Sequence, residues 1–151
     1  MPRVGGEKSM NGILGFFARI LGLGNNKGRN KMTRVLIVDD SPTETHVLKT
    51  ILEKNGYQTL SAPNGEEGIE VAKTEKPDLV LMDVVMPGLN GYQATRRLSR
   101  DPETSNIPVI IVTTKNQETD KVWGLRQGAK AYLVKPVSET ELLDRIKSVM
   151  P

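Results

Sequence analysis

The sequence contains no cysteine, and His46 is its single histidine. The lack of cysteine excludes disulfide bonds and thiolate metal sites and favours a reducing compartment, so we expect a cytoplasmic location. Because the lone His46 falls in a predicted helix, a zinc site would have no suitable ligand set. No apolar run approaches the roughly 18 residues that a transmembrane helix requires.

Excess positive charge is also absent from most of the chain, although the formal net charge is +3. Residues 1–31 hold six Lys or Arg and one Glu, a net charge of +5, whereas residues 32–151 hold fifteen Lys or Arg and seventeen Asp or Glu, a net charge of −2. The high isoelectric point therefore reflects a basic N-terminal segment, and we expect no nucleic-acid binding.

The basic segment 1–31 also carries half of the glycines. Within it, "GILGFFARILGLG" spaces its apolar residues as a short amphipathic helix does, but three glycines weaken that helix and Arg19 interrupts it. The following "GLGNNKGRNK" is typical of a flexible linker. Two interpretations stay open: an upstream start or disordered leader, or an anchor to a partner or a membrane surface, with residues 13–23 as the membrane contact.

From Met32 onward, short apolar runs alternate with segments of helical periodicity. Strands are predicted over 34–38, 57–62, 78–83, 107–114 and 131–136, and helices over 41–56, 64–76, 91–100, 117–128 and 138–150. Ser41 and Ser138, each followed three residues later by Glu, predict two capping boxes. We therefore expect an α/β fold, a doubly wound five-stranded parallel sheet, as one domain over 32–151 with 1–31 as a short extension.

Charged and hydroxyl side chains stand at the carboxyl ends of the predicted strands. They are, in chain order, Asp39 and Asp40, Asp83, Thr113 and Thr114, and Lys135. Ligands of such sheets bind outside these ends, so we expect the side chains to converge. Three neighbouring carboxylates need a cation, and their hard oxygens favour Mg²⁺.

This set of groups indicates phosphoryl chemistry. Beside a divalent cation a carboxylate can attack a phosphoryl group, while an ammonium neutralises the transferring oxygens and a hydroxyl hydrogen-bonds to them. Strand alternation allows only one of Thr113 and Thr114 to face the site, and their positions in the sequence leave both open.

Residues 33–150 resemble response-regulator receiver domains, which have the flavodoxin/CheY-like (βα)5 fold. The resemblance rests on the Asp-Asp pair, "LMDVVMPGLNGY", Thr113 and "YLVKP" in this order. The long stretch "IPVIIVTTKNQETDKVWGLRQGAKAYLVKPV" resembles PilH-type receivers of the type IV pilus chemosensory system, which drives twitching motility. Those receivers lack a leader like residues 1–31, so the resemblance implies nothing about that segment.

The resemblance implies a role for each residue of the acidic site. Asp83 corresponds to the phosphoacceptor, and Asp39 and Asp40 join it in holding Mg²⁺, to which Val85 would add its backbone carbonyl. Lys135 corresponds to the lysine that pairs with the phosphoryl group. Its peptide bond to Pro136 is cis in the family, an isomer that X–Pro bonds tolerate.

The resemblance also implies a switch. Thr113 corresponds to the switch hydroxyl and Tyr132 to the aromatic switch residue. Val85 and Lys115, two positions past the phosphoacceptor and the switch hydroxyl, are expected to tune phosphoryl lifetime. His46 is expected to be solvated, whereas Trp123 suits either core packing or partner contact.

The implied function is a stand-alone phosphorylation switch fed by a CheA-like histidine kinase. The chain would be a stoichiometric phosphoacceptor that catalyses its own phosphorylation and dephosphorylation, rather than an enzyme acting on an external substrate. Its output would pass to a protein of the pilus machinery through a face built from 117–128, 131–136 and 138–150. A phosphate sink and a non-phosphorylated binding module remain alternatives.

Two other function classes fit less well. Haloacid-dehalogenase phosphatases place their two aspartates two residues apart, whereas Asp39 and Asp40 are adjacent. A flavodoxin needs a phosphate-binding loop after the first strand, where these acids would repel the flavin phosphate.

Overall fold

The computed structural model describes residues 32–150, in which five strands alternate with five helices. The strands are β1 (Arg34–Val38), β2 (Gln58–Ala62), β3 (Leu79–Met82), β4 (Val109–Thr113) and β5 (Ala131–Val134). The helices are α2 (Pro42–Lys54), α3 (Gly65–Glu75), α4 (Gly91–Arg100), α5 (Glu118–Arg126) and α6 (Glu139–Val149). The predictions for residues 1–31 lie outside the described residues. Within 32–150, no helix has the length and hydrophobicity to span a bilayer.

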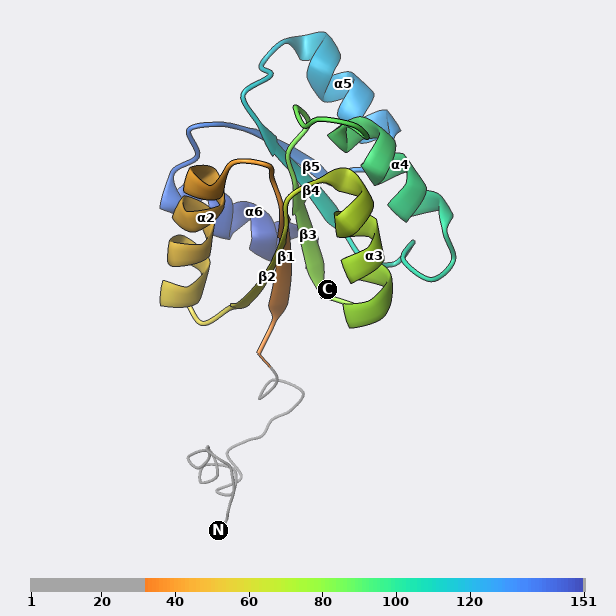
Figure 1. Ribbon diagram of the computed structural model, residues 1–151. Helices are drawn as coiled ribbons and strands as arrows, with labels where there is room; N and C mark the ends of the chain where they lie inside the picture. The colour runs from red at the N-terminus through yellow and green to blue at the C-terminus, as the bar shows by residue number, and fades with distance from the viewer. Residues whose placement is uncertain (1–31, 151) are drawn as a thin grey trace. The chain divides into compact units, whose positions relative to one another are not determined.

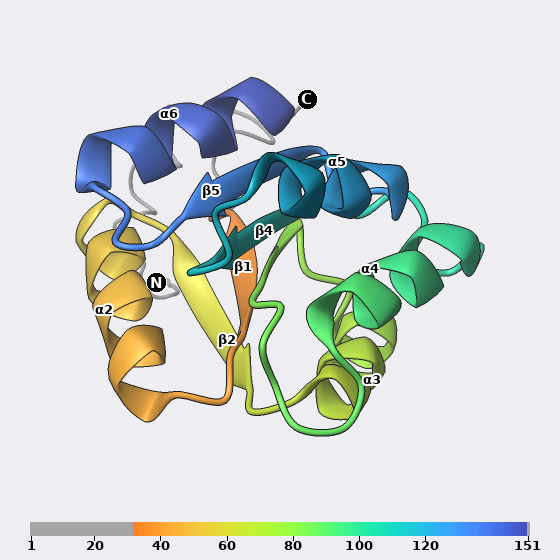
Figure 2. The same ribbon diagram turned by 90° about the horizontal axis from the view of Figure 1, so that it is seen from above.

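The five strands form one parallel sheet in the order β2-β1-β3-β4-β5. Helices α2 and α6 cover one face, and α3, α4 and α5 cover the other (Figures 1 and 2). This arrangement confirms the predicted doubly wound sheet. After β1 the chain first builds to one side and then crosses to the other, so a crevice opens at the carboxyl ends of β1 and β3.

The central strands are buried on both sides, which explains their continuous apolar sequences. Successive side chains of β1 point to opposite faces. Val35 and Ile37 pack with α2 and α6, while Leu36 and Val38 pack with α3 and α4. The polar side chains at the end of this strand therefore stand on a rigid, fully packed support.

Each of the two predicted capping boxes forms only the hydrogen bond to its serine side chain. The predicted return bonds from the glutamate side chains are absent from both helices, and that part of the prediction was wrong. Ser41 Oγ accepts a hydrogen bond from the Glu44 backbone N–H at 3.2 Å, and Ser138 Oγ accepts one in the same way at 3.0 Å. The Ser41 N–H that Glu44 was expected to reach donates instead to Asp39 Oδ1 at 2.9 Å. The acidic site thus competes with the cap for this donor and frees the Glu44 side chain.

A complete capping box begins α4, directly after the loop that carries Asp83. Asn90 and Gln93 exchange hydrogen bonds of 2.9 Å between their side chains and backbone N–H groups. The Gly91 N–H donates to the Val84 carbonyl at 3.0 Å, and a Cβ on Gly91 would overlap the Asp83 carbonyl oxygen. A glycine is therefore required where α4 meets the Asp83 loop.

Helix α2 offers a test of which face carries the packing energy. Leu52 is fully buried on this helix, whereas Val47 is 47% exposed. We expect Leu52→Ala to lower the free energy of unfolding by about 2–5 kcal/mol, because it leaves a cavity. Val47→Ala should stay within about 0.5 kcal/mol of the wild type. Urea unfolding followed by circular dichroism measures both, and equal losses would contradict this packing.

Candidate functional site

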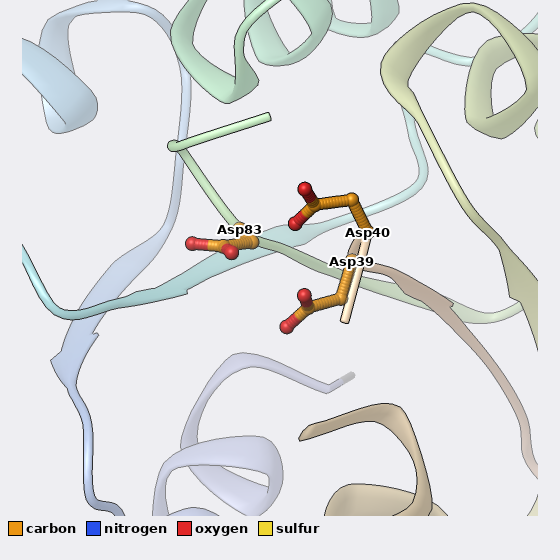
Figure 3. Close-up of side chains that lie close together, drawn as sticks. All are labelled: Asp39, Asp40 and Asp83. Atoms are coloured by element: carbon orange, nitrogen blue, oxygen red, sulfur yellow. The ribbon is translucent and has the colours of Figure 1, made fainter. Parts of the chain in front are cut away.

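Three carboxylates meet at the carboxyl ends of the neighbouring strands β1 and β3. Asp39 and Asp40 follow β1, Asp83 follows β3, and one oxygen from each lies within 4.8 Å of the other two. Figure 3 shows the three side chains gathered at these strand ends. Asp39 and Asp83 are only 4% and 8% exposed, whereas Asp40 is open to solvent. The structure therefore brings the predicted acids together at one edge of the sheet.

Lys135 reaches this acidic group from the end of β5. Its Nζ lies 2.7 Å from Asp39 Oδ2, 3.6 Å from Asp83 Oδ2 and 3.8 Å from Glu44 Oε1. Its peptide bond to Pro136 is cis, as the resemblance implies. One buried ammonium therefore faces several carboxylates, and the site keeps an excess of negative charge.

The surroundings of Asp83 oppose its ionisation. Burial raises the pKa of Asp83 above its ordinary value, and the nearby charge of Asp39 adds to the increase. The Lys135 charge and hydrogen bonds from the Thr113 side chain and the Val84 N–H lower the pKa, but they do not offset the burial. The Val84 N–H lies 2.7 Å from Oδ1 of Asp83. The carboxylate is thus held in place while its charge remains poorly neutralised.

Lys135 shows the opposite balance. Burial lowers its pKa, but the hydrogen bond to Asp39 and the charges of Asp83, Asp39 and Glu44 outweigh this and raise the pKa. The side chain therefore stays charged. Its ammonium is the nearest fixed positive charge to Asp83, at 3.6 Å.

The donor set fits a hard divalent cation. Carboxylate oxygens are the ligands that Mg²⁺ prefers, and Mg²⁺ keeps several waters rather than demanding a full protein cage. Asp40 is exposed, so the cluster has one open side where such waters would stand. Val85 follows Asp83 in the same loop, and its side chain is 58% exposed at the rim of the site.

The end of β4 resolves the choice between the two threonines. Thr113 is fully buried beside Asp83, while Thr114 is exposed. Thr113 Oγ1 accepts a long hydrogen bond of 3.5 Å from the Lys115 N–H. The Lys115 ammonium lies 3.7 Å from Asp120 Oδ1, in the first turn of α5, and is therefore paired within the chain.

Tyr132 lies buried between β4 and α5, where it packs with Ile111. Its hydroxyl donates to the Lys115 carbonyl at 3.0 Å and lies 3.4 Å from the hydroxyl of Tyr92. Burial and the Tyr92 hydroxyl raise the pKa of Tyr132, so the phenol remains protonated. The phenol thus connects β5 with the loop that follows Thr113.

Two residues near the site were not foreseen. Glu44 was expected to cap α2 but lies near Lys135 instead, and Tyr92 was read only as part of a helix. Neither contact leaves a local signal, since each joins positions far apart in the chain. His46 is exposed as predicted, and Trp123, which is 48% exposed, belongs to the surface rather than the core.

Because folding raises the pKa of Asp83, the folded protein binds the proton of this carboxyl group more tightly than the unfolded chain does. Ionisation of Asp83 therefore weakens the folded state as pH rises above the ordinary carboxyl range. We expect Asp83→Asn to raise the free energy of unfolding at pH 7 in EDTA, by more than the roughly 0.5 kcal/mol scatter of neutral surface changes.

The matched control is Asp144→Asn on the exposed side of α6, which should leave stability unchanged. Added Mg²⁺ should stabilise the wild type and the control but not Asp83→Asn, because one ligand is lost. Urea titrations with EDTA and with Mg²⁺ measure both effects. A metal-free Asp83→Asn variant less stable than the wild type would contradict the electrostatic argument.

The sequence and the fold both have counterparts among known proteins. Residues 35–147 match the family described as the response regulator receiver domain. The chain is 66% identical to the protein PilH of Pseudomonas aeruginosa over 119 residues, which span 79% of this chain and 98% of that protein. It is 41% identical to the phosphate regulon transcriptional regulatory protein PhoB of the same organism, but spans only 51% of that longer protein.

Solved structures give the same result. The chemotaxis protein CheY4 of Vibrio cholerae superposes with a TM-score of 0.75 at 28% identity, covering 80% of this chain and all of that one. The receiver domain of a Pseudomonas aeruginosa sensor histidine kinase, described with a magnesium ion in its active site cleft, superposes with a TM-score of 0.73 at 28% identity, covering 78% and 97%. The acids lie at the strand ends where this fold predicts a ligand site. The match over residues 35–147 and the identity to PilH show that the chain belongs to the response regulator receiver domain family.

Proposed function

We propose that the chain is a single-domain response regulator that accepts a phosphoryl group from a histidine kinase on Asp83. The observation that carries this proposal is a buried carboxylate with a fixed ammonium 3.6 Å away and two further acids beside it. The proposal assigns residues 32–151 to the receiver domain and residues 1–31 to an N-terminal extension.

The geometry distinguishes the two oxygens of Asp83. Oδ1 accepts the Val84 N–H at 2.7 Å, which leaves Oδ2, on the Lys135 side, to attack phosphorus. In that step the bond from phosphorus to the kinase histidine breaks as the bond from phosphorus to Oδ2 forms. Lys135 balances charge on the transferred oxygens. The chain therefore acts as a stoichiometric acceptor that promotes its own phosphorylation and dephosphorylation.

A bound Mg²⁺ would be held by Asp39, Asp40, Asp83 and the backbone carbonyl of Val85. Its chemistry there is the neutralisation of charge on the carboxylates and the phosphoryl oxygens. Asp39 is already positioned for this by the hydrogen bonds that it accepts from the Lys135 ammonium and the Ser41 N–H. Asp40, which is exposed, would hold such an ion from the solvent side of the site.

Phosphorylation adds about two negative charges and strong acceptor oxygens at Asp83. Thr113, buried next to this carboxylate, hydrogen-bonds to the new group, and the change reaches the Lys115 loop, whose carbonyl accepts a hydrogen bond from the Tyr132 hydroxyl. The affected surface is the face of α5, β5 and α6, where Val122, Trp123 and Leu125 are exposed. An apolar, exposed surface of this kind suits protein partners, whose binding the switch controls.

The relatives support an assignment to a pathway. The 66% identity to PilH over nearly its whole length supports a place in type IV pilus twitching motility, with a CheA-like kinase as phosphoryl donor in the cytoplasm. Two outputs fit the same site: a signal to a pilus protein, or a sink that drains phosphoryl groups from the kinase. Rapid turnover without a phosphorylation-dependent partner would favour the sink.

The first test of phosphorylation is intact-mass spectrometry after incubation with acetyl phosphate. We expect the wild type to gain one phosphoryl group only when Mg²⁺ is present, and Asp83→Ala to gain none. Asp144→Ala, which removes an exposed carboxylate from α6, should behave as the wild type.

A gain that survives Asp83→Ala would place the acceptor elsewhere and overturn the proposal. Absence of any gain, with Mg²⁺ binding demonstrated by titration, would favour the alternative of a non-phosphorylated binding module.

Val85 and Lys115 offer a test of phosphoryl lifetime. An apolar group at the rim cannot orient an attacking water, so Val85→Asn should speed dephosphorylation several-fold. Lys115→Glu should change the rate as well, since it replaces a cation near the site and breaks the pair with Asp120. Loss of phosphoprotein is followed after removal of the donor, with Val47→Asn on α2 as control. Rates equal to the wild type in both variants would defeat this role.

A further inference from the structure

The hydroxyl of Tyr132 belongs to a network that extends beyond the switch residues to α4. The Tyr132 hydroxyl donates to the Lys115 carbonyl at 3.0 Å and lies 3.4 Å from the Tyr92 hydroxyl. Tyr92 in turn lies 3.3 Å from the Asp120 carbonyl in the first turn of α5. One pair of phenols therefore joins α4, β5, the loop after β4 and the start of α5.

Tyr92 contributes a hydrogen-bond donor to the pair of phenols. Each phenol has one proton to donate and an oxygen that accepts. The Tyr132 proton serves the short bond to Lys115, so the Tyr92 proton is shared between the Tyr132 oxygen and the Asp120 carbonyl. Without the Tyr92 hydroxyl, the buried Tyr132 oxygen has no donor within this network, a loss that disfavours burial.

Gly124 on α5 makes the room that the buried ring occupies. A Cβ at this position would lie 2.9 Å from Cδ2 and 3.0 Å from Cε2 of Tyr132, and 2.8 Å from Cδ1 of Ile111. Such distances are too short for carbon atoms, whose contacts are optimal near 3.5–4.0 Å. The ring, the helix or Ile111 would have to move. The space for Tyr132 thus depends on a residue without a side chain.

The network also touches the acidic site. Tyr92 follows Gly91, whose N–H donates to the Val84 carbonyl and at which a Cβ would overlap the Asp83 carbonyl oxygen. The first turn of α4 is therefore joined to the Asp83 loop, and Tyr92 connects this turn with the phenol of Tyr132 by contacts that do not include Thr113.

We propose that Tyr92 and Gly124 are positioning residues that hold Tyr132 in its buried position before any phosphorylation. Gly124 provides the space and Tyr92 the hydrogen bond. Phosphorylation then adds little to the burial of this ring, and its effect reaches α5 through Lys115 and Asp120. The part concerning phosphorylation rests on the proposed function, whereas the position of the ring in the unmodified protein does not.

The experiment uses the full chain labelled with 3-fluorotyrosine and observed by ¹⁹F NMR. The chain has three tyrosines, so Tyr→Phe variants assign the signals. We expect the Tyr132 signal of the unmodified protein to be that of a buried ring, with a small shift on changing from H₂O to D₂O. Addition of Mg²⁺ and beryllofluoride, a stable mimic of the phosphoryl group, should leave it nearly unchanged.

Gly124→Ala should shift the Tyr132 signal to a solvent-exposed position, and Tyr92→Phe should raise the exposed population several-fold. Beryllofluoride with Mg²⁺ should then drive the ring back towards the buried signal in both variants. Gly124→Ala should also lower the free energy of unfolding, because the new Cβ would collide with the ring. Helix propensity alone would predict an increase, because Ala is the better helix former. If Gly124→Ala lowers stability in the wild type but raises it in a Tyr132→Ala background, the ring is the cause.

The inference is overturned if the wild-type Tyr132 signal is exposed without beryllofluoride, or if both variants keep the buried signal. Should Gly124→Ala fail to fold, Tyr92→Phe decides alone, since it removes one hydroxyl from a half-buried helix position. A wild type whose ring is buried but which binds no beryllofluoride would contradict the proposed function and leave the positioning role standing.

Discussion

The crowding of carboxylates around one ammonium is the constraint on which the rest of the structure depends. Asp39 and Asp83 are buried at neighbouring strand ends, and Lys135 crosses from β5 to stand between them. The parallel sheet makes this possible, since the reversal of strand order opens a crevice there. Folding therefore builds a site whose negative charge is only partly neutralised, and such a site fits a divalent cation.

Neighbouring segments lose favourable local interactions to accommodate this site. The Ser41 N–H turns to Asp39 instead of Glu44, which leaves α2 with half a capping box. Gly91 is required because any side chain would overlap the Asp83 backbone. The raised pKa of Asp83 shows the same conflict in electrostatic form. Function here rests on groups that the folded state alone would not favour, a pattern common at active sites.

The region around Thr113 and Tyr132 is held mainly by packing and hydrogen bonds rather than by charge. Thr113 is buried beside Asp83. The Lys115 carbonyl accepts a hydrogen bond from the Tyr132 hydroxyl, and the Lys115 ammonium pairs with Asp120. These contacts link the acidic site to α5 within a few residues, and the Tyr92 hydroxyl adds a path from α4. Because packed interfaces shift between discrete arrangements, these contacts support the proposed transmission of a change at Asp83 to the exposed side chains of α5.

The sequence by itself determined the order of strands and helices along the chain, the apolar character of β1, β3 and β4, and the placement of the acids and Lys135 at strand ends. Those features follow from local periodicity and from the alternation of apolar segments, which neighbouring residues set. Tertiary structure decided what joins distant positions: Thr113 rather than Thr114 beside Asp83, Glu44 near Lys135, and Tyr92 against Tyr132. These contacts depend on register and on which helices share a face, and both are fixed only when the sheet and its two helical layers pack together.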